Sequence, residues 1–174
     1  MPALGGPVVV MSILLVVGGA AKLWRPANTV GALRTLRLPA AAVLVRLLAT
    51  FEVAVGASAI VIGNRLTAVL LAASYLGFTG FVLVAMARGG ALSSCGCFGT
   101  PDTPPTVMHV VVTLAASAVA CAAIAHPVGH VLDRLTGQPL AGLPFVALTA
   151  CSVWFAYVGL AVLPRTSVFY RHRS

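Results

Sequence analysis

Charged residues are scarce in this chain of 174 residues, and its polar sequence is confined to short connections. Only 8% of the residues are charged, 60% are hydrophobic, and the mean hydropathy is +1.04. Soluble domains have about 25% charged residues, so this composition excludes that class and indicates an integral membrane protein. Because no long polar segment is present, we predict a single transmembrane domain over residues 1–174 and no soluble catalytic domain.

Signatures of cofactor and nucleic-acid binding are also missing. The sequence has no haem attachment motif and no paired histidines within an apolar run, so we expect no cofactor and see no sign of haem or quinone ligation. The net charge of +8 is spread over the flanks of apolar segments, without the aromatic-interleaved patch that binds bases. We therefore expect the lipid bilayer and its anionic headgroups as partners, and no nucleic acid.

Five apolar segments predict five transmembrane helices. Three stretches of about 20 residues or more hold no Asp, Glu, Lys or Arg, namely 66–87, 103–132 and 135–164. Two further apolar segments contain charges, because the first reaches Lys22 and the second includes Arg46 and Glu52. The predicted fold is an all-α, multi-pass membrane helix bundle, with helices near 6–24, 40–62, 66–87, 105–125 and 143–163.

The basic residues predict an orientation. The first connection carries Arg25, Arg34 and Arg37 beside Lys22, and the C-terminal tail carries three more arginines. The positive-inside rule places both in the cytoplasm, so with five spans the N-terminus lies outside and the C-terminus inside. By the same parity, the connection between the third and fourth helices faces the cytoplasm.

The most distinctive stretch, ALSSCGCFGTPDTPP, lies in that connection. Cys95 and Cys97 flank Gly96, whose backbone freedom favours the tight ring that a disulfide between them would close. Such a ring is strained, and strain raises the reduction potential, so we expect an exchange-competent bond and not a permanent one. Phe98 is an apolar anchor for the loop, and Gly99 is one of several turn-forming residues around the pair.

Two other interpretations of the pair stay open. Two thiolates suit soft metal ions such as Cu(I) or Hg(II), with His109 as a candidate third ligand beside Cys95 and Cys97. A closed zinc site takes about four ligands and is not indicated, because the sequence has no second pair of this kind. Alternatively, the cysteines have no chemical role and the protein is a non-catalytic membrane scaffold.

Three short motifs together resemble the MauE family of methylamine-utilisation membrane proteins, within the wider MauE/DoxX group. They are SCGCFG after the third apolar span, GGAAKL at the end of the first and FEVAVG in the second, and the resemblance covers roughly residues 10–125. It implies a four-helix DoxX-like core with one added helix, in the bacterial cytoplasmic (inner) membrane. It also implies a redox-associated protein that works with a thioredoxin-like partner in disulfide formation in an exported enzyme, such as the small subunit of methylamine dehydrogenase.

The resemblance assigns several positions. Cys95 and Cys97 match the family cysteines, Glu52 matches its acidic position in the second helix, and Lys22 matches its basic position ending the first. His109 departs from the pattern, in which an Asn is expected near the start of the next helix. Maturation of an exported enzyme favours an outward-facing pair, whereas the basic residues predict an inward-facing one, so the side of the membrane stays open.

Glu52 lies near the middle of the second predicted helix, where an ionised carboxylate is costly unless it is protonated or paired. Arg46 is on the same helix but about 120° away around its axis, so a direct pair within the helix is not expected. Lys22 or Arg46 can reach Glu52 across helices. Glu52 is then either a proton acceptor for a thiol or a hydrogen-bonding group, with candidate partners Ser74, Tyr75 and Thr79.

The two remaining cysteines lie in the fourth and fifth predicted helices. Cys121 is about 25 Å deeper than Cys97 at the helical rise, which excludes direct exchange between them. We expect Cys121 and Cys151 to act as small apolar side chains, with a bridge between them as the alternative. His126 and His130 have helical metal spacing, but Pro and Gly between them favour a loop, so no metal site is predicted there.

Overall fold

A computed structural model of the chain describes residues 4–88, 106–130 and 139–159, and this part is helical with no strand. Its helices are α1 (Gly5–Trp24), α2 (Pro26–Thr35), α3 (Ala42–Val61), α4 (Arg65–Ala87), α5 (Val107–Ala125) and α7 (Pro139–Tyr157). Four of them, α1, α3, α4 and α5, are long and apolar enough to cross a membrane, and the 143–157 part of α7 is a shorter apolar helix. The predicted all-α membrane bundle is confirmed.

The helix starts differ from the prediction by one or two residues, and by four at α7. The fourth predicted helix begins at Val107 and not at 105, because Thr106 is its N-cap, and α7 begins at Pro139, before the expected 143. The connection after α1, for which no helix was predicted, contains α2. Proline at 26 suits a first helical position and restrains the residue before it, so α1 ends and α2 starts at this point.

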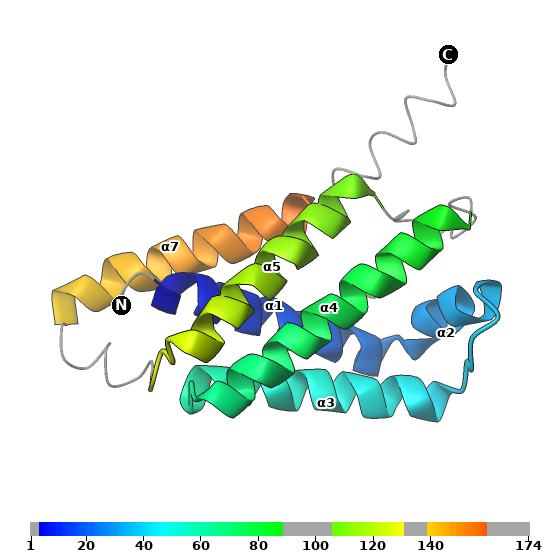
Figure 1. Ribbon diagram of the computed structural model, residues 1–174, viewed down its shortest axis with the longest axis horizontal. Helices are drawn as coiled ribbons and strands as arrows, with labels where there is room; N and C mark the ends of the chain where they lie inside the picture. Colours follow the sequence, from blue (N-terminus) through cyan, green and yellow to red (C-terminus); the bar gives the residue numbers. More distant parts are fainter. Residues whose placement is uncertain (1–3, 89–105, 131–138, 160–174) are drawn as a thin grey trace, which may run out of the picture.

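The four long helices form two antiparallel pairs, α1 with α3 and α4 with α5 (Figure 1). Glycine brings α1 and α3 together. A Cβ atom added at Gly19 would lie 2.8 Å from the carbonyl oxygen of Ala49, and one at Gly56 would lie 2.7 Å from that of Ser12. Small residues therefore permit close helix packing here, as is common between helices in membranes.

The second pair is held by a core of small and apolar side chains and by hydroxyl groups. Leu71, Ala116 and Ala120 are fully buried in a cluster that joins α4 and α5 to α1. The Tyr75 hydroxyl donates to the carbonyl oxygen of Met11 at 2.7 Å, which ties α4 to α1. The core thus lies where α1 meets α4 and α5.

The two ends of the bundle are built differently. At one end, Gly63 turns the chain from α3 into α4 with a φ of +58°, and its carbonyl oxygen accepts a bond of 3.1 Å from the amide of Gly129, beyond α5. At the other end, α2 packs on the C-terminal end of α4 through Ala32, Leu36 and Ala85. Figure 1 shows α2 beside the end of α4, from which the connection that carries the cysteine pair leaves.

Candidate functional site

The predicted cysteine site lies outside the described residues. Cys95, Gly96, Cys97, Phe98 and Gly99 all fall between the end of α4 and the start of α5. The described anchor of this connection is well defined, because Nη1 of Arg88 at the C-cap of α4 donates to the carbonyl oxygen of Leu36. The connection therefore starts at the end of the bundle where α2 lies.

Glu52 forms a buried ion pair with Lys22. Its Oε2 atom lies 2.6 Å from Nζ of Lys22, and the two side chains are 1% and 4% exposed. Of the two cations predicted to reach Glu52 across helices, the structure selects Lys22, and Arg46 is exposed. The pair links the end of α1 to the middle of α3, about 15 Å along α3 from its start.

The second carboxylate oxygen of Glu52 takes no part in the ion pair. Oε1 of Glu52 is buried and has no hydrogen-bond partner among the described residues. Nζ of Lys22 lies 4.6 Å from the ring centre of Phe78, a distance at which a cation interacts favourably with an aromatic face. A buried acceptor without a donor costs about 1–3 kcal/mol, so this oxygen is a place where a donor would bind.

The hydroxyl partners predicted for Glu52 bind elsewhere. Ser74 donates to the carbonyl oxygen of Leu70, Tyr75 to that of Met11, and Thr79 to Tyr75 and Thr113. The prediction that they could satisfy Glu52 is therefore wrong for the described structure. Serine and threonine in membrane helices often bond back to the preceding turn, which explains two of these contacts.

His109 has a structural role at the start of α5. Its Nδ1 atom lies 2.9 Å from Oγ1 of Thr106 and 3.3 Å from the amide of Thr106, which completes a capping box. The side chain is buried. Within the described residues no group of three or more His, Cys, Asp and Glu side chains comes together. The role of His109 as a third ligand of a soft metal stays a prediction.

A cavity of about 390 Å³ lies beside the ion pair, among α1, α2, α3 and α4. Lys22 and Glu52 provide its charged wall, and Phe51, Phe78 and Phe81 provide aromatic surface. Its other lining residues include Thr29, Leu33, Leu48 and Gly77. Leu48 and Phe51 are each 47% exposed, so the cavity reaches the outer surface of the bundle, which faces lipid. We call this space the α3/α4 cavity.

Lys22 also lines a second, smaller cavity of about 50 Å³ on its other side. Phe78, His109 and Thr113 share in its lining, together with residues of α1. The ion pair thus lies between the α3/α4 cavity and the first turns of α5. Those turns follow the connection that contains the cysteine pair.

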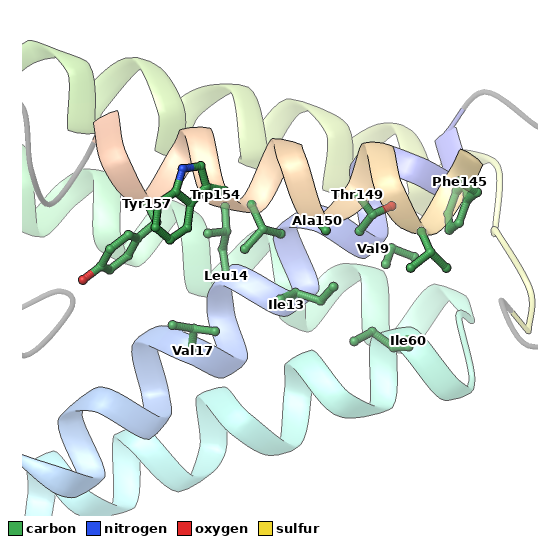
Figure 2. Close-up of a pocket in the computed structure, with 12 residues that line it drawn as sticks. Val9, Ile13, Leu14, Val17, Ile60, Phe145, Thr149, Ala150, Trp154 and Tyr157 are labelled. Atoms are coloured by element: carbon green, nitrogen blue, oxygen red, sulfur yellow. The ribbon is translucent and has the colours of Figure 1, made fainter. Parts of the chain in front are cut away.

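A third cavity, of about 560 Å³, lies between α1, α3 and α7 (Figure 2). Leu14, Ile60, Ala150 and Trp154 are among the side chains that surround it, and no charged residue takes part. Its volume exceeds that of the α3/α4 cavity, but it offers a ligand little beyond apolar contact. A lipid acyl chain suits such a lining.

Cys121 and Cys151 are free and exposed, so the alternative bridge between them is not formed in the structure. His126 is the C-cap of α5, and Nδ1 of His130 lies 2.6 Å from the carbonyl oxygen of Val61. The predicted loop around these histidines is confirmed, since α5 ends at Ala125. Neither pair forms a site in the described structure.

The comparisons with known proteins identify a family whose match covers most of the chain. The family described as methylamine utilisation protein MauE matches residues 3–127. The chain belongs to the MauE family. The MauE match spans α1 to α5 and includes both the Lys22–Glu52 pair and the Cys-Gly-Cys motif, while α7 lies beyond it. No curated protein matches the chain, and neither does any solved structure.

Sequence reasoning missed the parts of the site that depend on tertiary structure. It singled out Lys22 and Glu52 in this MauE protein, but it assigned no role to α2 or to Phe51 and Phe78. Proline at position 26 was a signal for the start of α2. The aromatic wall had no comparable signal, because phenylalanines in apolar helices face lipid, core or cavity with the same local sequence.

Proposed function

We propose that this protein exchanges disulfides with a thioredoxin-like partner through Cys95 and Cys97, and thereby supports disulfide formation in an exported enzyme of methylamine metabolism. The observation that carries the proposal is the Cys-Gly-Cys motif inside the region matched by the MauE family. Its position supports the proposal as well. The motif follows, in the sequence, the end of α4 that α2 and Arg88 hold at one end of the bundle.

The exchange balances without a further reagent. A thiolate of the partner attacks one sulfur of the Cys95–Cys97 disulfide, the other cysteine leaves as a thiolate, and a mixed disulfide forms. The partner's second thiolate then attacks the mixed disulfide, and the partner leaves in its oxidised form. Two electrons pass to the pair, and the two protons lost by the partner's thiols equal the two that the new dithiol takes up.

The orientation of the pair in the membrane belongs to the proposal. Lys22, Arg25 and Arg34 lie in or beside α2, at the end of the bundle where the cysteine connection begins. The positive-inside rule favours a cytoplasmic pair, with the N-terminus outside, whereas oxidation of an exported enzyme requires an outward-facing pair. Labelling of Cys95 and Cys97 with a membrane-impermeant maleimide, from each side and in reduced and oxidised samples, tests this orientation.

Thiol trapping in the producing cells tests the exchange. We expect Cys97→Ser or Cys95→Ser to accumulate a mixed disulfide after acid quenching and alkylation, visible on a non-reducing gel, with a partner whose own paired cysteines mass spectrometry identifies. Cys121→Ser and Cys151→Ser are matched controls, because both residues are free, exposed and remote from the connection. They should leave the trapped species unchanged.

Two results would contradict the proposal. If neither single variant traps a partner and the double serine variant still supports maturation of its host's enzyme, the scaffold interpretation holds instead. If the reduced protein binds Cu(I) stoichiometrically and the double variant does not, while no mixed disulfide forms, the pair is a soft-metal site.

A further inference from the structure

The α3/α4 cavity holds an unsatisfied polar atom within an otherwise apolar space. Glu52 is 1% exposed and lines the cavity, and its Oε1 atom has no hydrogen-bond partner among the described residues. A buried ion pair is favourable only when its remaining hydrogen-bonding positions are also satisfied. The wall of the cavity is therefore incomplete without a group that donates a hydrogen bond.

Lys22 gives the same wall a second polar function. Nζ of Lys22 has three donors and uses one on Glu52. A ligand beside the pair thus meets an acceptor and a cationic donor next to each other. A molecule that presents a hydroxyl in one state and a carbonyl in another matches both groups.

The apolar lining defines the rest of the ligand. Phe51, Phe78 and Phe81 offer ring surface for a flat aromatic head group, since aromatic rings pack favourably at offset or edge-on angles. A volume of about 390 Å³ accommodates one small ring system and the first part of a chain. The half-exposed Leu48 and Phe51 leave a way out to the bilayer for a longer tail.

We propose that the α3/α4 cavity binds the head group of a lipid-soluble quinone, with Glu52 accepting from the hydroxyl of the quinol form and Lys22 donating to the carbonyl of the quinone form. The redox use of the site rests on the proposed function, in which Cys95 and Cys97 are left as a dithiol after each exchange. The dithiol becomes a disulfide and gives up two electrons and two protons, and the quinone takes up both to become a quinol. The ammonium group of Lys22 stabilises negative charge that develops on the quinone oxygen.

The third cavity is the internal comparison for this assignment. It is larger, at about 560 Å³, yet its lining carries no charged side chain. Acyl chains and detergent should enter it without preference. A quinone should prefer the α3/α4 cavity, because there the head group meets a cationic donor and a carboxylate acceptor side by side.

Gly77 and Gly80 provide a matched pair of variants. Both lie on α4, and a Cβ atom added at either would meet nothing within 4 Å, so neither substitution should disturb the fold. Gly77 lines the α3/α4 cavity and Gly80 does not. Gly77→Leu should fill the cavity, whereas Gly80→Leu should add the same side chain outside it.

Equilibrium dialysis of decylubiquinone with the purified full-length protein in detergent measures binding. We expect Gly77→Leu to weaken the Kd at least tenfold and Gly80→Leu to leave it within twofold. Decylbenzene, which has a ring and a tail but no oxygen, should not compete. Equal binding by the two leucine variants, or competition by decylbenzene as strong as that of unlabelled quinone, would overturn the assignment.

The cysteine variants keep this test separate from the proposed function. Cys95→Ser/Cys97→Ser should bind decylubiquinone with unchanged Kd, because Lys22 and Glu52 make the hydrogen bonds of the proposed site. Quinone binding without any trapped partner would refute thiol exchange and leave the cavity assignment standing. A trapped partner without quinone binding would do the reverse. In the reduced wild-type protein we expect one quinone reduced per cysteine pair, at least tenfold more slowly in Gly77→Leu.

Discussion

The interface between α1 and α3 and the interface between α3 and α4 use the same helix in opposite ways. Against α1, the backbone of α3 comes so close that Gly19 and Gly56 have no room for a Cβ atom. Against α4, α3 leaves a cavity of about 390 Å³, and Gly77 faces open space. Figure 1 shows α3 along the lower edge of the bundle, with α1 and α4 both above it.

The Lys22–Glu52 pair belongs to both interfaces. It joins α1 to α3 across the tight contact, and it forms the charged wall of the open one. Close packing between α1 and α3 excludes water from the pair and holds its two side chains in place. On the open side, Glu52 lines the cavity, and its buried Oε1 atom has no hydrogen-bond partner among the described residues. We call the close contact of α1 and α3 through Gly19 and Gly56 the seam. A rigid contact of this kind beside a cavity is a suitable support for a binding site, because it holds the polar groups in position before the ligand arrives.

Breaking the ion pair should have the largest effect on stability, and the two single variants should differ. Lys22→Met leaves Glu52 unpaired near the middle of α3, about 14 Å from the nearer end of that helix, and breaking a buried pair in this way costs about 3–5 kcal/mol. Glu52→Leu leaves Lys22 only about 3 Å from the end of α1, so its side chain can extend to the headgroup region. We expect Glu52→Leu to cost at least about 1 kcal/mol less than Lys22→Met.

Reversible unfolding in mixed micelles, followed by circular dichroism, measures both free energies of unfolding. The double variant Lys22→Met/Glu52→Leu is the control, because it removes both charges and should recover much of the loss. Equal losses for the two single variants would show that the depth of each residue in the helix does not decide the cost.

Adding a methyl group at the glycine contacts between α1 and α3 should have the next largest effect. Gly56→Ala places a methyl group 2.7 Å from a backbone oxygen of α1, and Gly19→Ala places one 2.8 Å from a backbone oxygen of α3. Backbone cannot rotate away as a side chain can, so the helices must separate. We expect each variant to lose about 1–3 kcal/mol in the same unfolding measurement. Gly31→Ala, in α2, meets nothing within 4 Å and is the control, with no loss expected.

The close contact between α1 and α3 could be predicted from the sequence, whereas the α3/α4 cavity could not. Helix positions followed from the lengths of apolar runs, and small residues such as Gly18-Gly19 within an apolar run are typical of close helix packing. Which face of each helix packs was harder, since Ala20 and Ala57 have the same chemistry as their neighbours but are exposed. The partner of Glu52 was correctly limited to two cations, because few charges exist in the spans.

The other features that were not predicted correctly from the sequence have a common physical cause. The hydroxyl groups of Ser74, Tyr75 and Thr79 were predicted as partners of Glu52, but each one satisfies a nearer acceptor. The helix α2 is short and its sequence is mixed, so hydropathy gave no reason to separate it from a loop. A cavity depends on how helices that are distant in sequence fail to meet, and no local pattern records that.

The smallest expected effect has the opposite sign and sharpens the comparison of the two interfaces. Gly77→Ala and Gly80→Ala add a methyl group to α4 where nothing lies within 4 Å, so the helix gains conformational stability without a clash. Alanine is favoured over glycine inside a helix by about 0.5–1 kcal/mol. We therefore expect each variant to gain at least a few tenths of a kcal/mol in its free energy of unfolding. The unfolding measurement should therefore show a gain on α4 and a loss for the same substitution at the seam. A loss at Gly77 together with a gain at Gly80 would mean that α3 and α4 close on each other in the membrane, and that the α3/α4 cavity is not open.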